Sequence, residues 1–165
     1  MARIRIVPIV LALAALVVGS VPPAASAAPD QGKRTVTITH APVSPILVQG
    51  SGIGAVRTFF VATEVDGTSY PGSYLTGTLT TVAVDGNAST ELRSSNLIFT
   101  SGRQANQLVV GGISTYPAAD ATLAVGQRTI RPIVGGSGMY NGARGYVVSR
   151  NLGDRGWVHT FHLLR

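Results

Sequence analysis

The chain of 165 residues contains no cysteine. That absence excludes disulfide bonds, thiol nucleophiles and cysteine-based zinc sites, so a folded domain must rest on its hydrophobic core. Acidic residues are also scarce, with 7 Asp and Glu against 13 Lys and Arg. Few carboxylates are therefore available for acid–base chemistry.

Basic residues are more numerous, but they are scattered. Lys33 is the only lysine, and the arginines never form a run. Nucleic-acid-binding proteins usually carry a basic stripe, so we predict no nucleic-acid partner. Among the 3 histidines, His159 and His162 lie three positions apart on an expected strand and therefore point to opposite faces. We predict no metal site.

The N-terminal segment has the pattern of a secretory signal peptide. Arg3 and Arg5 precede an apolar run over residues 6–18, and a small-residue cleavage site ends at Ala27. We predict a signal peptide over residues 1–27 that is cleaved after Ala27, a flexible leader over residues 28–33, and a secreted mature protein. The apolar run is short for a stable membrane span. An uncleaved N-terminal anchor is the alternative.

The remainder, residues 34–165, predicts one all-β domain. Apolar and polar residues alternate in the first segment, Asp66-Gly67 and Asp85-Gly86 are strong turn signals, and no segment shows a capped helical period. Strands are expected over residues 34–40, 45–49, 55–65, 74–84, 90–100, 106–112, 122–134, 143–150 and 157–164, with a loop over residues 114–121. This spacing is typical of a sandwich or a barrel.

A glycine-rich segment over residues 131–146 is the most specific feature of the chain. Five glycines fall between positions 135 and 145, a density typical of a sharp turn or a close backbone approach. The run Val134-Gly-Gly-Ser-Gly-Met-Tyr-Asn-Gly-Ala-Arg-Gly-Tyr146 resembles the motif of the dirigent and allene oxide cyclase superfamily. His159-Thr-Phe-His-Leu163 resembles the closing strand of the cyclases, and Ile38-Thr-His40 the first dirigent strand.

The resemblance implies a single eight-stranded antiparallel β-barrel with an apolar cavity, commonly assembled as a trimer. A barrel of that size holds one small ligand. The resemblance further implies a protein that binds a small apolar molecule and steers its cyclisation or coupling without a cofactor. A dimer or trimer is the expected form of any homo-oligomer. Ala41 stands where the dirigent strand has aspartate, Thr39 stands where the cyclases have an acid, and the cyclase cysteine has no counterpart.

These departures leave open whether the protein is an enzyme. The alternative is a non-catalytic extracellular binding or interaction protein that uses the same barrel. A third possibility is an unrelated sandwich, which predicts no pairing between the first and last strands. A barrel filled with side chains would exclude catalysis, whereas a catalyst needs a candidate residue inside an open apolar pocket.

Candidate site residues are few. Glu64 and Glu91 are the acids within expected strands, and Glu91 shares its face with Arg93, Ser95, Leu97 and Phe99. Arg144, inside the glycine motif, could reach an anionic or carbonyl group or could pin the turn. We take Glu64, Glu91 and Arg144 as catalytic candidates, and Tyr140, Arg144, Tyr146 and His40 as candidates for ligand contacts. The alternative for the acids is a solvated carboxylate near a strand end, and for the last strand a packed stripe that includes His159.

Overall fold

The computed structural model describes residues 34–44, 46–117 and 122–164. The predicted signal peptide, its cleavage site and the leader lie outside these residues. Within the described ranges, regular structure is nearly all strand, with two short 3-10 helices. None of the described helices is long and apolar enough to cross a membrane.

Nine strands follow one another along the described residues. Their bounds are β1 (Arg34–His40), β2 (Leu47–Gln49), β3 (Val56–Val65), β4 (Thr68–Val84), β5 (Thr90–Ser101), β6 (Arg103–Pro117), β7 (Arg128–Gly136), β8 (Arg144–Asn151) and β9 (Trp157–Leu164). The 3-10 helices η1 (Gly138–Tyr140) and η2 (Gly153–Arg155) precede β8 and β9.

Three strand boundaries differ from the sequence-based prediction by five residues or more. β4 begins at Thr68 rather than residue 74, because the Pro71-Gly72 step is accommodated by an irregularity in the pairing with β3. β6 continues to Pro117 through a segment predicted as loop, because its ladder with β5 extends to that residue. β7 begins only at Arg128, later than the predicted residue 122.

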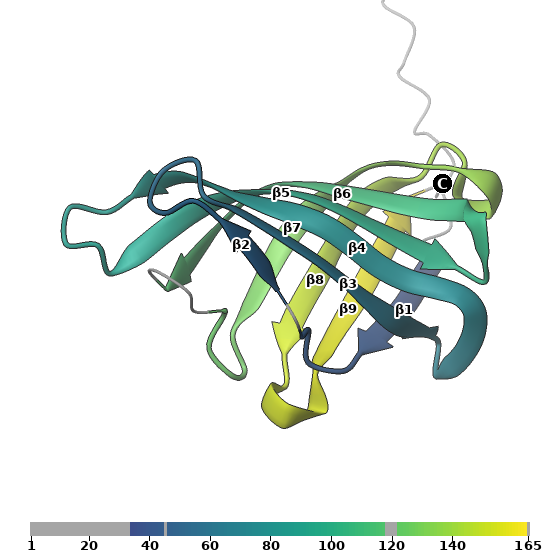
Figure 1. Cartoon of the computed structure of the whole chain (residues 1–165). Helices are drawn as coiled ribbons and strands as arrows, with labels where there is room; N and C mark the ends of the chain where they lie inside the picture. Colours follow the sequence, from purple (N-terminus) through teal and green to yellow (C-terminus); the bar gives the residue numbers. More distant parts are fainter. Residues whose placement is uncertain (1–33, 45, 118–121, 165) are drawn as a thin grey trace, which may run out of the picture.

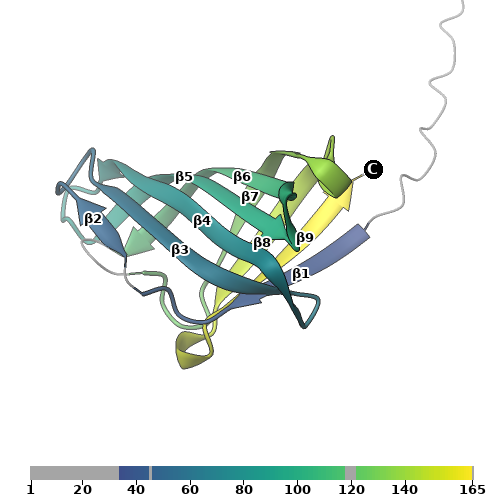
Figure 2. The same ribbon diagram turned by 45° about the vertical axis from the view of Figure 1, so that its right-hand side comes forward.

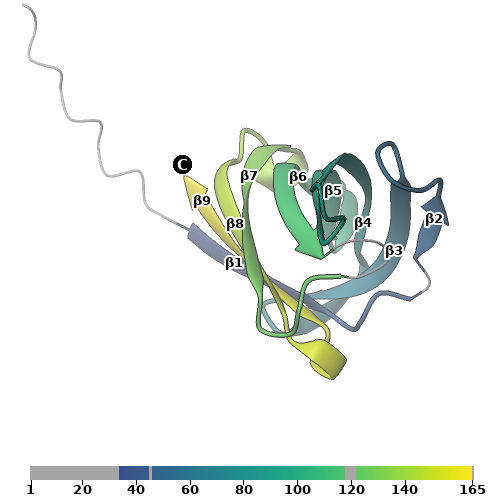
Figure 3. The same cartoon turned by 90° about the vertical axis from the view of Figure 1, so that its left-hand side faces the viewer.

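The strands form an eight-stranded antiparallel barrel with one additional strand. Their order is β1-β9-β8-β7-β6-β5-β4-β3-β2, and a further pairing between β1 and β3 closes the ring. Figures 1 and 2 show the strands from the side, and Figure 3 shows them surrounding a common interior with β2 outside β3. The first and last strands pair from Arg34↔Leu163 to His40↔Trp157. The sandwich alternative is therefore wrong.

The closing seam is short and is supported by a turn residue. β1 and β3 share only the pairs Ile38↔Val65 and Thr39↔Glu64. Just beyond them, the backbone N–H of Thr37 donates to Asp66 Oδ1 at 2.8 Å, and the backbone N–H of Asp66 donates to the carbonyl of Thr37 at 2.7 Å. The turn aspartate thus extends the seam with its own side chain.

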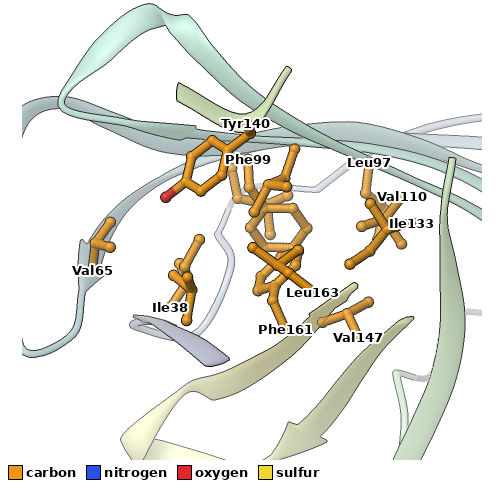
Figure 4. Packing of buried hydrophobic residues seen from close by; sticks show 13 residues of the cluster. Ile38, Val65, Leu97, Phe99, Val110, Ile133, Tyr140, Val147, Phe161 and Leu163 are labelled. Carbon is orange, nitrogen blue, oxygen red and sulfur yellow. The ribbon is translucent and has the colours of Figure 1, made fainter. Parts of the chain in front are cut away.

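Inward-facing side chains pack densely at one end of the barrel. Figure 4 shows this cluster, in which the rings of Phe99 and Phe161 meet edge to face with centroids 5.0 Å apart. η1 closes the same end and inserts Tyr140, whose side chain is 4% exposed, into the cluster. The cluster consists of Val36, Ile38, Val65, Leu75, Leu97, Phe99, Leu108, Val110, Ile133, Tyr140, Val147, Phe161 and Leu163.

The glycine motif serves close backbone packing. Gly145 has a φ of +128° on β8, and a Cβ placed there would collide with the carbonyl oxygen of His162 on β9. Gly136 likewise lies against the backbone of Tyr140. These contacts explain why side chains are missing at these two positions.

Gly145→Ala is expected to lower the free energy of unfolding by at least about 2 kcal/mol, because backbone strain and a collision with β9 add together. Gly142→Ala is the matched control: its φ is also positive, at +75°, but its Cβ would meet nothing within 4 Å. Its cost is expected to be only about 1 kcal/mol. Chemical denaturation measures both, and equal losses would contradict the role of the β8–β9 approach.

Candidate functional site: a cavity in the barrel

A cavity of about 510 Å³ occupies the end of the barrel opposite η1. This is the end where β1 finishes at His40 and β9 begins at Trp157. The lining is mostly apolar: Phe59, Leu75, Leu79 and Leu97 come from β3, β4 and β5, and the segment between β1 and β2 adds Pro42, Val43 and Ile46. The barrel is therefore packed at one end and open to a small molecule at the other.

A buried cluster of charged side chains lies in the wall of this cavity. Glu91 Oε2 accepts hydrogen bonds from Arg93 Nε at 2.8 Å and from Thr81 Oγ1 at 3.0 Å. It also lies 3.4 Å from Arg57 Nη2. Burial by itself raises the pKa of Glu91, but these hydrogen bonds and the charges of Arg93 and Arg57 outweigh burial and hold that pKa below its ordinary value. Glu91 is thus an ionised structural partner of two arginines that line the cavity.

A third arginine, Arg131 on β7, lines the same cavity and donates hydrogen bonds to two hydroxyl groups. Its Nη2 donates to Tyr116 Oη and its Nη1 to Thr129 Oγ1, both at 2.6 Å. Two guanidinium groups lie over the ring of Tyr116. The Arg93 guanidinium carbon is 4.5 Å from the ring centroid, and the Arg131 guanidinium carbon is 5.9 Å from it. Arg131 is only 3% exposed, and its buried Nε has no hydrogen-bond partner.

Two histidines on β1 and β9 form a directed hydrogen-bond chain beside the same cavity. His40 Nδ1 lies 2.6 Å from the carbonyl of Ala41, which can only accept, so this nitrogen carries the proton. In the neutral ring His40 Nε2 then accepts from His159 Nε2 at 3.0 Å. His159 Nδ1 in turn accepts from Ser149 Oγ at 2.8 Å. With the protons assigned in this way, both imidazoles are neutral and each of their ring nitrogens makes one hydrogen bond.

The surroundings favour those neutral imidazoles. Burial lowers the pKa of His40, opposed by its hydrogen bond to Ala41. Burial is the largest cause that lowers the pKa of His159 well below its usual value, and the charges of the nearby His40 and Arg131 lower it further. Trp157 lies beside the pair, with its ring 6.1 Å from that of His159 and nearly parallel.

Comparisons with known proteins bear on the fold of this site. No protein-family model matches the chain, nor does any curated protein. Among solved structures, pyocyanin demethylase is similar with a TM-score of 0.58 at 14% identity, over 80% of this chain and 99% of that protein. A pterocarpan synthase dirigent protein is similar with a TM-score of 0.51 at 14% identity, over 87% of this chain and 93% of that protein.

The fold is a dirigent/allene oxide cyclase-like β-barrel. The likeness extends over 87% of this chain, so the predicted barrel fold is confirmed.

The dirigent-like barrel brings only some of the predicted site residues to the cavity. His40 lines it, and Glu91 is buried in its wall behind Arg57 and Arg93. Tyr140 is buried at the packed end, where it contributes to the hydrophobic cluster instead.

Three other candidates point away from the cavity. Glu64 is exposed on the outer face of β3, because its inward neighbours are Thr63 and Val65. Arg144 and Tyr146 lie on the outer face of β8, and the ring of Tyr146 stacks on that of His162 with centroids 4.6 Å apart. The expectation that any of these three enters an interior pocket is wrong for this fold, because strand parity turns them outward.

Sequence reasoning overlooked the arginines of the cavity. Arg57, Arg93 and Arg131 all share a strand face with buried apolar residues, for example Arg131 with Ile133. An arginine at an inward position of an expected strand was therefore the available signal. His159 was expected to be packed, and it is buried, but it also lines the cavity. Within the described ranges, no three His, Cys, Asp or Glu residues are grouped as a metal site.

Glu91→Gln is expected to lower the free energy of unfolding by about 3–5 kcal/mol, because it leaves buried guanidinium groups without the carboxylate that binds them. Glu64→Gln, on the outer face of β3, is the matched control and is expected to change stability by less than about 0.5 kcal/mol. Urea denaturation compares the two. A Glu91 variant as stable as the control would show that the ion cluster contributes nothing to folding.

Stability is expected to fall as the pH drops below about 6.5, the ordinary pKa of histidine. Below that pH the unfolded chain protonates His40 and His159, whereas the folded chain resists because both pKa values are lowered. The unfolded state then binds more protons, and stability recovers as the pH rises again. Carboxylates titrate at lower pH.

Denaturation curves between pH 7.5 and 5 measure this slope. The double variant His40→Gln/His159→Gln should lose most of it. His162→Gln, on the outer face of β9, should keep it. A slope that survives the double variant would disprove its assignment to the histidine pair.

Proposed function

We propose that the protein binds a small, largely apolar molecule in the barrel cavity. The supporting observation is a cavity of about 510 Å³ with mostly apolar walls in a barrel whose other end is closely packed. Cavities that hold small molecules typically measure about 300–1,000 Å³ and combine an apolar lining with a few placed polar groups. The arginines, Tyr116 and the histidine pair are such groups.

We further propose that confinement in this cavity steers cyclisation or coupling of the bound molecule without a cofactor. The two proteins with similar folds are named for a demethylation of pyocyanin and for the synthesis of a pterocarpan. Both names describe reactions of small molecules, which supports a ligand-handling role for this barrel. The hydrogen-bonded chain of His40, His159 and Ser149 adds polar groups to the cavity lining.

We also propose that the protein is secreted. This rests on the basic, apolar and small-residue pattern of residues 1–27, which is that of a signal peptide.

A second candidate is a non-catalytic interaction protein, including self-assembly into a dimer or trimer. The outer face supports it, because large apolar side chains such as Phe60, Ile113 and Ile130 are each about 60% exposed there, at 62%, 59% and 64%. Exposed apolar side chains often mark a surface that a partner buries. Native mass spectrometry distinguishes the two candidates, since it reports both retained ligand and subunit number.

Binding of the uncharged fluorescent probe N-phenyl-1-naphthylamine tests the main proposal. Its emission should rise on addition of the protein, and excitation of Trp157, the single tryptophan, should transfer energy to it because Trp157 lines the cavity. Leu79→Trp fills the cavity and should weaken binding at least about tenfold, a loss of roughly 1.4 kcal/mol.

Ile130→Trp adds the same side chain on the outer face and is the matched control. Thermal melts confirm that both variants fold. Absence of probe binding by the wild-type protein, or equal binding by both variants, would overturn the cavity as the ligand site.

A further inference from the structure

We infer that the ligand of the cavity carries a carboxylate, and that Arg131 and Tyr116 bind it. This inference rests on the proposed function, since it names the chemical class of the molecule that the cavity takes.

The first support is the state of Arg131. Its guanidinium is a permanent charge, is almost entirely withdrawn from solvent, and lines the cavity. Its side-chain partners, Tyr116 and Thr129, are neutral hydroxyls, and within the described residues no carboxylate forms an ion pair with it. Arginines withdrawn from water are normally paired with an anion. Glu91, by contrast, already engages Arg57 and Arg93.

The second support is that Arg131 and Tyr116, which both line the cavity, keep hydrogen-bond donors without an acceptor. Arg131 Nε is buried without an acceptor. Tyr116 Oη accepts from Arg131, so its own proton remains to be donated. A planar carboxylate suits this arrangement, because it can accept from a guanidinium edge and from a phenol at the same time.

The remaining charged and titratable groups of the cavity do not compete for this role. Asp154 is exposed at the mouth, on η2, where water screens its charge. His40 and His159 are occupied by their mutual hydrogen bond, and burial favours their neutral forms. The anion is therefore directed to the β6–β7 wall, and the apolar body of the ligand to Phe59, Leu79 and Leu97.

A matched pair of probes tests this inference. 2-Naphthoate and 2-naphthamide share size and shape, but only the first is an anion at pH 7.5. Quenching of Trp157 emission measures both affinities in the full mature protein. We expect 2-naphthoate to bind the wild-type protein at least tenfold more tightly than 2-naphthamide.

Substitutions test which residues produce the preference for 2-naphthoate. Arg131→Gln should reduce 2-naphthoate affinity at least tenfold and leave 2-naphthamide affinity within threefold. Tyr116→Phe should produce a smaller loss for 2-naphthoate alone. Arg150→Gln removes an exposed arginine from the outer face of β8 and should alter neither affinity.

The outcomes separate this inference from the proposed function. Equal wild-type affinity for the two naphthyl probes overturns the carboxylate and leaves the cavity proposal standing. A preference that survives in Arg131→Gln overturns the assignment to Arg131. If N-phenyl-1-naphthylamine and both naphthyl probes all fail to bind, the proposed function itself fails. Because the first comparison uses only the wild-type protein, it holds even if the Arg131 variant does not fold.

Discussion

Closure of the sheet by β1 is the constraint on which the rest of the structure depends. β1 pairs along its whole length with β9 but shares only two residue pairs with β3, and the Asp66 turn adds hydrogen bonds to Thr37 at that seam. Closure satisfies the backbone groups of the first and last strands and turns one face of every barrel strand toward a common interior. Without it, the inward arginines and histidines would lie on an open sheet.

The interior is divided along the barrel axis. Inward rows change from apolar to polar along individual strands, as from Phe99 and Leu97 to Arg93 on β5, and from Phe161 to His159 on β9. Antiparallel pairing brings the apolar halves together at the end closed by η1 and the polar halves together at the other end. The packed half supplies the hydrophobic stabilisation, and the polar half is left with the cavity.

Burial gives the polar half its chemical character. Burial lowers the pKa values of both histidines, which favours an uncharged hydrogen-bond chain, whereas two arginines keep Glu91 ionised. The site thus combines fixed cationic donors with neutral imidazoles around one cavity. Such an arrangement would suit recognition and orientation of a small molecule, as proposed above.

Much of the fold followed from local signals. The alternation in residues 34–40, the Asp-Gly turns and the glycine motif indicated the strands and the barrel, because period-two patterning and positive-φ turns are encoded locally. Strand boundaries at Pro71-Gly72 and Gly111-Gly112 were misjudged, because pairing with neighbouring strands carries the ladder through such residues. For the site, the sequence yielded His40 and Glu91 but not the arginine wall.

The sequence by itself determined the all-β class and which residues share a strand face. Only the tertiary structure decided which face is interior. Glu64, Arg144 and Tyr146 lie on the outer face, and Tyr140 lies in the packed core. The tertiary structure also decided that His40 meets His159, 119 positions away along the chain. The physical reason is that closure and register are set by pairing between distant strands, and no local pattern specifies which strands will meet.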